Sequence, residues 1–515
     1  MSARRKLIVL LIILVAGSAV RLFAASTLDG ILPLDGLYVD EVEYSRGLDA
    51  LTNPPFERPP GMYFLAWVTG LRENVIGARL LFSLLSMLPA ACILIAFGNR
   101  RWGITCAVAA ALEPMTAFFG LQLLPAIPAA ALLSLALLAA VKKRAFAACF
   151  LAGAAVLFRG EIVILLPVLL IMSLGLRERL RRHLWYSSIL LVPVLPVVML
   201  NLSSGAGAVI STNGAENLWL GTEWKLLATP PGVEFEALMR LDSPEMTSDQ
   251  HFGRLAMENI FSSPGAWIWM GARKVIAACT FPGPGRNLEI PELIRRTGLI
   301  FLLPLSLLFF SLAVARLSMQ RRRDFSNRLS MAMICTIAIA AFLFIPAARY
   351  RTALFPACFF LAASSKPSRN EIIRGSSIAV LVTLASLLIP FPGSPRKGLT
   401  EVQSAQEWLD RGESDRALEE IRIAAENGYE GADMHNIAGA ALSDAGRESD
   451  GLREFLTALA AVPDSPTLWR NTAVSLWNLG RYTEGLEAAQ KAVNLDPRLE
   501  EQLAPILEWG RDAVR

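Results

Sequence analysis

The chain has 515 residues, of which 54% are hydrophobic and only 18% charged, and its mean hydropathy is +0.45. Soluble domains carry about a quarter of charged residues, so this composition excludes an ordinary soluble enzyme. The net charge of +4 combines a basic apolar part, up to about residue 397, with an acidic part that has 22 acidic and 11 basic side chains.

The first apolar run, near residues 7–25, is followed by two acidic residues, Asp40 and Glu41, and then by Glu57-Arg58-Pro59-Pro60. A carboxylate can take a proton from an incoming hydroxyl, and an arginine can hold a phosphate that leaves. The two prolines stiffen the chain beside Arg58. The alternatives are ordinary loop charges or a helix N-cap for the acids, and an arginine whose charge reaches out to the membrane surface.

Apolar runs of about 15–25 residues, separated by short Arg/Lys clusters, are typical of a polytopic membrane protein. We expect about 11 membrane helices in the first 397 residues. A cleavable signal peptide is the alternative for the first run. Spans are predicted near 7–25, 76–98, 103–141 (two spans), 145–175 (two spans), 297–315 and 351–364.

The basic clusters fall on every second loop when the N-terminus is cytoplasmic, in agreement with the positive-inside rule. They include Arg100-Arg101, Lys142 to Arg144, Arg177 to Arg182, Arg321 to Arg323 and Lys366 to Arg374. The remaining loops therefore face the outside, together with the C-terminal part. They contain residues 26–75, the turn at 159–161, a long segment of about 203–296, and residues 349–351.

The acidic C-terminal part repeats with a period of 34 residues. Gly412, Gly446 and Gly480 share one phase, and small residues recur at two further phases. The unit from Leu468 to Pro497 resembles the tetratricopeptide repeat, in which stacked helix pairs bury a shared core. Such a stack presents a groove for a peptide or a protein partner. The alternative is a spacer or self-association module.

Several segments of the membrane part resemble GT-C glycosyltransferases, which include protein O-mannosyltransferases and the lipid A aminoarabinose transferase. They are Tyr38 to Tyr44, Phe56 to Tyr63, Ala78-Arg79-Leu80, Leu157 to Ile162, Ser211 to Thr222 and Ala348 to Pro356. The resemblance covers most of residues 1–364. It implies an all-α fold, in which a helical membrane bundle precedes the repeats.

The resemblance also implies inverting sugar transfer from a polyprenyl-phosphate monosaccharide. Asp40 matches the aspartate that such enzymes use as general base, so Asp40 and Glu41 are the catalytic candidates; Glu43 and Asp35 are fallbacks. Arginine suits phosphate because its planar fork makes paired hydrogen bonds. The substrate-binding candidates are Glu57, Arg58, Arg159, Asn217, Arg349 and Arg351, and Asn213 and Trp219 are further candidates for contacts with the sugar. For Asn213, Asn217 and Trp219, a purely structural loop is the equal alternative.

Metal and disulfide chemistry have little support in the sequence. The chain has only three scattered histidines, and its six cysteines lie in or beside apolar segments without a CxxC spacing. Glu57 matches a position that in some relatives helps to bind a metal, so a divalent cation is the alternative to a metal-independent enzyme. The segment Met115 to Pro128 departs from the mannosyltransferases because it has no charge, with Gln122 as its only strongly polar side chain.

We therefore predict a transferase domain over residues 1–397 and a repeat domain over 398–515, in the cytoplasmic membrane of a bacterium with the repeats on the periplasmic or extracellular side. The expected partners are a polyprenyl-phosphate-linked sugar, a protein, lipid or glycan acceptor, and a protein bound by the repeats, but no nucleic acid. A non-catalytic membrane scaffold and a lipid-linked sugar transporter are the alternatives. A transporter would more readily show internal repeats or mid-membrane charges.

Overall fold

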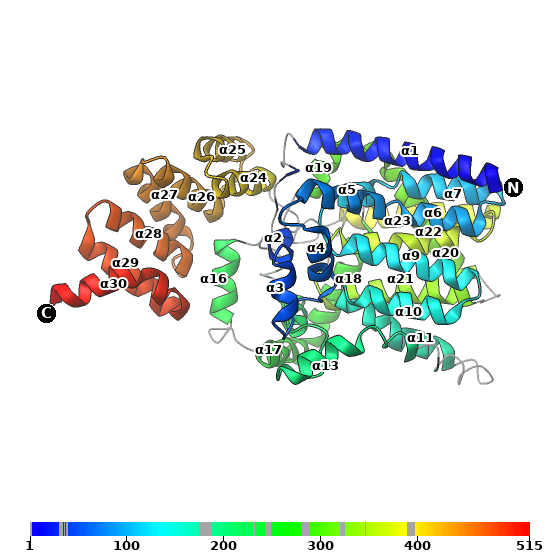
Figure 1. Cartoon of the computed structure of the whole chain (residues 1–515), viewed down its shortest axis with the longest axis horizontal. Coiled ribbons are helices and arrows are strands. Elements are labelled where there is room, and N and C mark those ends of the chain that lie inside the picture. Colours follow the sequence, from blue (N-terminus) through cyan, green and yellow to red (C-terminus); the bar gives the residue numbers. More distant parts are fainter. Residues whose placement is uncertain are drawn as a thin grey trace.

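The computed structural model describes residues 3–29, 34–35, 37, 40–174, 185, 188–223, 225, 227, 229, 232–242, 249–280, 289–319, 325–345, 347–388 and 397–514. These residues form helices and turns without any β-strand, which confirms the predicted all-α class. Figure 1 shows a bundle of long helices at one end, a stack of helices at the other, and a layer of short helices between them. The predicted basic loops at 177–182 and 321–323 lie outside the described residues.

The long helices carry the apolar runs of the sequence. Four described segments are long and apolar enough to cross a membrane: 4–28, 75–97, 299–316 and 325–343. Shorter apolar helices lie among them. The bundle comprises α1 (Ala3–Leu28), α5 (Val75–Leu85), α6 (Leu88–Phe97), α7 (Arg101–Ala111), α8 (Pro114–Phe119), α9 (Ala126–Val141), α10 (Ala145–Val156), η1 (Gly160–Ile164), α11 (Leu165–Leu174), η3 (Leu299–Leu302), α20 (Leu303–Met319), α21 (Phe325–Leu343), α22 (Tyr350–Ala363) and α23 (Arg369–Leu388).

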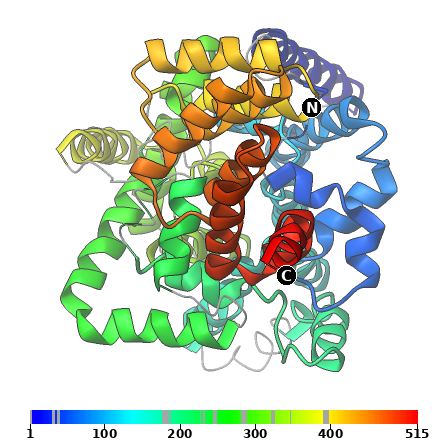
Figure 2. The same ribbon diagram turned by 90° about the vertical axis from the view of Figure 1, so that its left-hand side faces the viewer.

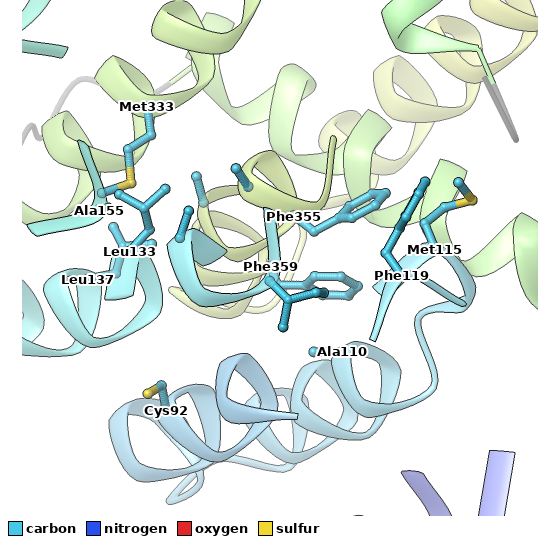
Figure 3. Close-up of a cluster of buried hydrophobic side chains, with 14 of the residues drawn as sticks. Cys92, Ala110, Met115, Phe119, Leu133, Leu137, Ala155, Met333, Phe355 and Phe359 are labelled. Carbon is cyan, nitrogen blue, oxygen red and sulfur yellow. The ribbon is translucent and has the colours of Figure 1, made fainter. Parts of the chain in front are cut away.

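Helix α9 lies at the centre of the bundle and packs against α6, α10 and α22. Its many alanines are almost fully buried, and small side chains let neighbouring helices approach closely. Figure 3 shows the resulting core, where Leu133 and Leu137 of α9 lie near Met333 of α21, and Phe355 and Phe359 of α22 lie near Phe119. The bundle is thus held by side-chain packing between helices far apart in the chain.

One predicted span is divided into two helices in the structure. The run at 76–98 forms α5 and α6, which are separated at Ser86 and Met87 because Pro89 has no backbone N–H to continue the first helix. Arg21 of α1 donates from Nε to the Ser86 hydroxyl at 2.7 Å and from Nη1 to the Ala111 carbonyl at 2.8 Å. In the region 103–141, where two spans were predicted, the short helix α8 lies between α7 and α9.

The C-terminal part consists of three helix pairs and a final helix. The pairs are formed by α24 with α25, α26 with α27, and α28 with α29, and each makes its main contacts within the pair. Gly412, Gly446 and Gly480 occupy the turns inside the pairs with φ of 74–75°, a left-handed conformation that favours glycine. The helices are α24 (Leu399–Asp410), α25 (Ser414–Glu426), α26 (Ala432–Asp444), α27 (Glu448–Ala461), α28 (Pro466–Asn478), α29 (Tyr482–Leu495) and α30 (Glu500–Val514).

The layer between the two parts is built from the segments that the charge pattern placed outside. Figures 1 and 2 show this layer at the end of the bundle that faces the repeat helices. Its helices are α2 (Asp40–Tyr44), α3 (Gly47–Thr52), α4 (Gly61–Thr69), α13 (Leu195–Ser203), α14 (Gly214–Leu220), α16 (Val233–Asp242), α17 (Asp249–Ser262), α18 (Pro264–Cys279) and α19 (Ile290–Arg296). Asp40 begins the first of them.

Candidate active site

The Asp40 carboxylate lies between two arginines from distant parts of the chain. Arg58 donates from Nη1 to Oδ1 at 2.9 Å, and Arg349 donates from Nη1 to Oδ2 at 2.5 Å. All three side chains are partly exposed, at 14% for Asp40, 27% for Arg58 and 25% for Arg349. The structure therefore brings together three of the residues that the sequence predicted for one site, and solvent still reaches them.

Arg58 is positioned by the segment that follows it. Gly61 begins α4 and donates its backbone N–H to the Leu157 carbonyl at 2.7 Å. A Cβ at Gly61 would lie 2.6 Å from that carbonyl oxygen, so only glycine allows the contact without movement. Leu157, two residues before the predicted external turn at 159–161, thus anchors the chain just after Pro59 and Pro60.

Arg349 is held at the start of α22, and Tyr350 connects it to Arg159. The Arg159 guanidinium lies 4.0 Å from the centroid of the Tyr350 ring, and that of Arg349 lies 6.0 Å from it. Arg159 also forms a salt bridge with Glu161. The Tyr350 ring is therefore near both guanidinium groups, and Arg159 borders the site through this ring.

The electrostatics of Asp40 reflect two opposing effects. Burial raises the pKa of Asp40, but the charges and hydrogen bonds of Arg349 and Arg58 lower this pKa by a larger amount. The pKa of Asp40 therefore lies well below its usual range. Asp40 is consequently ionised at neutral pH. The Nε of Arg58 is buried and has no hydrogen-bond partner among the described residues.

Two tyrosine rings, those of Tyr44 and Tyr63, pack beside Arg58. The Arg58 guanidinium lies 5.6 Å from the centroid of the Tyr44 ring, and Tyr44 packs edge to face on Tyr63 with their centroids 5.8 Å apart. Tyr63 donates its hydroxyl to Glu43 Oε1 at 2.9 Å. Glu43, a fallback for the base, is therefore bonded to Tyr63 and not to either arginine of the site.

Glu41 has a different environment from its neighbour Asp40. Arg79 of α5 donates to both of its carboxylate oxygens, at 3.1 and 2.7 Å, and the Leu123 N–H donates to Oε1 at 2.8 Å. The Glu41 and Arg79 side chains are only 3% and 6% exposed. The structure thus places Glu41 in a buried ion pair that ties α2 to α5 and to the loop after α8.

Glu57 and Asn217 lie on the segments next to Arg58. The carbonyls of Phe56 and Glu57 accept the N–H groups of Thr212 and Asn213, at 2.9 and 3.2 Å, and the Glu57 side chain is exposed. Asn217 donates from Nδ2 to the Asn213 carbonyl at 2.7 Å. The other sugar-contact candidate on α14, Trp219, is 1% exposed and stacks on Phe252, so the expectation that it would contact a sugar is wrong.

Arg351 is not brought to Asp40. It is 1% exposed, and the carboxylate that acts on it is that of Glu113. Glu113 caps α8 and accepts hydrogen bonds from the Thr116 N–H at 2.6 Å and the Ser306 hydroxyl at 2.5 Å. Sequence reasoning missed Glu113 because it began the uncharged segment at Met115; an acid directly before Pro114 in an apolar region was the available signal.

The comparisons with known proteins found similarity only at the level of structure. No family model matches the chain, and no curated protein matches it. Two similar structures are ArnT from Cupriavidus metallidurans bound to undecaprenyl phosphate and the same protein in the apo state, with identities of 16% and 18% and a TM-score of 0.37 for each. The matches cover 92% and 88% of this chain and 79% and 80% of ArnT.

A likeness at this TM-score and identity carries no conclusion about the reaction. Among the described residues, no group of three or more His, Cys, Asp or Glu side chains lies close enough together to hold a metal ion.

Proposed function

We propose that this chain is a membrane glycosyltransferase. It transfers a monosaccharide from a polyprenyl-phosphate donor to a hydroxyl group of an acceptor, at the outer face of a bacterial cytoplasmic membrane. The observation that carries the proposal is the Asp40 carboxylate between Arg58 and Arg349, from segments 18 and 309 residues away, at one end of a bundle of apolar helices. Such a group combines a base with two phosphate-binding cations.

The arginines account for donor binding. A guanidinium has five N–H donors, and each arginine uses one of them on Asp40, so both can bind a phosphodiester without releasing the carboxylate. The buried Nε of Arg58 adds a donor with no partner among the described residues. When the phosphate binds, its negative charge raises the pKa of Asp40 and makes this carboxylate a stronger base.

The reaction then balances with Asp40 as base. The acceptor oxygen forms a bond to the anomeric carbon of the sugar while the bond from that carbon to the phosphate oxygen breaks. The proton of the acceptor hydroxyl passes to the Asp40 carboxylate, and the electron pair leaves with the polyprenyl phosphate. Arg58 and Arg349 stabilise the charge that develops on this leaving group. Attack from the face opposite to the phosphate inverts the configuration of the sugar.

The other predicted site residues take supporting roles in this proposal. Arg159 holds Tyr350 beside Arg349, while Glu57 and Asn217 border the space next to Arg58, where sugar hydroxyls would lie. Glu41 positions α2 through Arg79 and does not touch the substrate. Arg351 belongs to the bundle interior with Glu113.

The test is transfer of labelled sugar from a panel of polyprenyl-phosphate donors in membranes that contain the wild type or Asp40→Asn. We expect label in the acceptor fraction with the wild type and a decrease of ~10²–10⁴-fold with the variant. A chelator added to the wild-type reaction tests whether a divalent cation is required. Inversion is checked from the anomeric configuration of the product.

Matched controls separate the alternatives. Asp49→Asn changes an acid on α3, where no ion pair is seen within the described residues, and should transfer like the wild type. Equal transfer by Asp40→Asn and the wild type would exclude Asp40 as base. If no donor gives transfer but labelled lipid-linked sugar moves across the membrane of proteoliposomes, the result favours a transporter. If neither transfer nor transport occurs, the result favours a scaffold.

A further inference from the structure

Helix α16 belongs to the layer of helices between the bundle and the repeats, which we call the external layer after the predicted side of its segments. This helix lies against the repeat helices. Figure 1 shows it between the stack of α24 to α30 and the short helices α2 and α3. Asp433 of α26 accepts the Val233 N–H at the start of α16 at 2.6 Å, and Thr467 of α28 donates its hydroxyl to Glu236 at 2.7 Å. Two of the three repeat pairs therefore bind the first turn of α16.

Apolar contacts accompany these hydrogen bonds. Val233 and Ala237 are 6% and 4% exposed, although α16 lies outside the bundle. A Cβ at Gly232 would lie 2.1 Å from Asp433 Oδ1, so the start of α16 approaches the repeats as closely as a glycine allows. The two side chains pack among Ala432, Ala458, Leu459, Val462, Leu468 and Trp469 of the repeats.

The opposite side of α16 packs on the external layer. Met239 is 4% exposed and lies in a cluster with Trp219 of α14, Phe252 of α17 and Ile345, against which Phe235 and Leu238 also pack. The helix is thus buried from two sides, by the repeats and by the layer that contains α14. Helix α16 therefore connects the repeat helices to the layer that contains α14.

This layer continues to the candidate active site. Thr212 and Asn213, directly before α14, bond to the backbone of Phe56 and Glu57, which precede Arg58. A second attachment lies at α24, where Arg296 of α19 donates to Glu401 and Gly398 donates to Glu289, at 2.8 and 2.9 Å. The third is a salt bridge from Arg411 to Asp35, five residues before Asp40.

We propose that the face formed by the first turns of α26 and α28 is a receptor for α16 of the same chain, and that the repeat domain clamps the external layer over the site. The ligand of this face is a helix with acidic residues in its first turn and a small apolar side. Asp433 is a positioning residue in this view. An effect of the clamp on transfer rests on the proposed function, whereas the clamp itself does not.

Hydrogen exchange of the full-length protein in detergent tests the clamp without a substrate. In Asp433→Ala, the amides of residues 232–242 should exchange about fivefold faster, because the first turn of α16 loses a capping acceptor. Asp433→Asn keeps an acceptor oxygen and should exchange like the wild type. Unchanged exchange in Asp433→Ala would overturn the proposal.

A second pair of variants separates the clamp from its effect on transfer. Ala237→Arg places a long cation in the buried contact, whereas Ala445→Arg makes the same change at an exposed position of the repeats. We expect faster exchange at 232–242 and about tenfold lower kcat/KM for transfer in Ala237→Arg alone, because misplaced binding groups slow the reaction.

Each outcome of this pair has one meaning. Wild-type exchange at 232–242 in Ala237→Arg would overturn the clamp. Faster exchange with unchanged transfer would show a clamp that does not act on the site and would overturn that part of the proposal. A wild type that transfers no sugar at all would contradict the proposed function while the exchange data still decide on the clamp.

Discussion

Asp40 and Glu41 are neighbours in the sequence and both bind arginine, yet their surroundings differ in every other respect. Asp40 bonds to two arginines with a quarter of their side chains exposed, whereas Glu41 bonds to one arginine and one backbone N–H in an almost closed space. Successive residues of the short helix α2 point in different directions, one toward the external layer and one into the bundle.

This difference separates a group that can react from a group that holds the structure. A carboxylate that solvent reaches can exchange an arginine contact for a ligand at little cost. A fully buried carboxylate cannot exchange its partner at little cost, because loss of the partner leaves an unpaired charge that water does not reach. We therefore expect substitutions at Asp40 to change the reaction and substitutions at Glu41 to change the folding.

The largest effect is expected from Glu41→Gln, which leaves the Arg79 charge buried without its carboxylate. The free energy of unfolding should decrease by about 3–5 kcal/mol. Asp40→Asn should change it by about 1 kcal/mol or less, since its partners are partly exposed to solvent. Denaturation in detergent, followed by circular dichroism, measures both. An equal loss in the two variants would contradict the comparison.

The next effect concerns the cations beside Asp40. Arg349→Gln keeps a hydrogen-bonding side chain but removes the charge, and we expect kcat/KM to decrease by ~10²–10³-fold, as for the loss of one preorganised donor to a developing anion. Arg100→Gln, in a basic loop that the charge pattern predicts on the other side of the membrane, is the control. A decrease of the same size in that control would point to a general effect of charge removal.

The same variant should also alter the pH profile. The pKa of Asp40 is depressed in the free protein, so the carboxylate loses its proton at low pH and kcat/KM should show no acidic limb from Asp40 between pH 5 and 8. In Arg349→Gln the raising effect of burial meets only one opposing cation, and the acidic limb should move to higher pH. A limb that stays in place, or moves down, would exclude Asp40 as the titrating base.

The smallest effect is expected at Glu420 of the repeats, a half-buried carboxylate without an arginine bonded to it. Burial and the neighbouring charge of Glu401 raise the pKa of Glu420 to about 7. The folded state therefore binds this proton more tightly than the unfolded state, and its contribution to stability is lost as pH rises from about 4.5 to 7.

Glu420→Gln should remove this dependence. At pH 8 the variant should be more stable than the wild type by about 1 kcal/mol, a value reduced for solvent screening, and near pH 5 the two should be alike. Thermal unfolding at both pH values measures the difference. Glu426→Gln, on the exposed side of the same helix, should not reproduce it. Greater stability of the wild type at pH 8 would show that Glu420 is not shifted upward.

Local chemistry in the sequence was sufficient to predict much of this protein. The apolar runs predicted the helical class, and the 34-residue spacing of Gly412, Gly446 and Gly480 indicated the helix pairs, because a left-handed turn at this position favours glycine. The alternation of basic loops grouped Asp40, Arg58 and Arg349 on one side. The assignment of the repeats to the tetratricopeptide class and the domain boundary at 397 remain predictions.

The sequence could not predict the directions in which these side chains point. Sequence spacing could not show that Asp40 and Glu41 bind different arginines, that the Arg351 side chain is buried, or that Trp219 is part of a core. Nor could it show that Arg21 would reach Ser86, at the break before Pro89, from another helix. Each of these outcomes is decided by which neighbour is nearest in space.

By itself, the sequence thus determined the helical class and the residue types available for chemistry, and it predicted that the charged residues share one side. These follow from hydropathy, charge and backbone conformation, which act over a few residues. Only the tertiary structure decided which carboxylate faces solvent and that α16 lies between the repeats and the site. Both depend on contacts between segments up to hundreds of residues apart, and burial and charge at those contacts are properties of the packed chain alone.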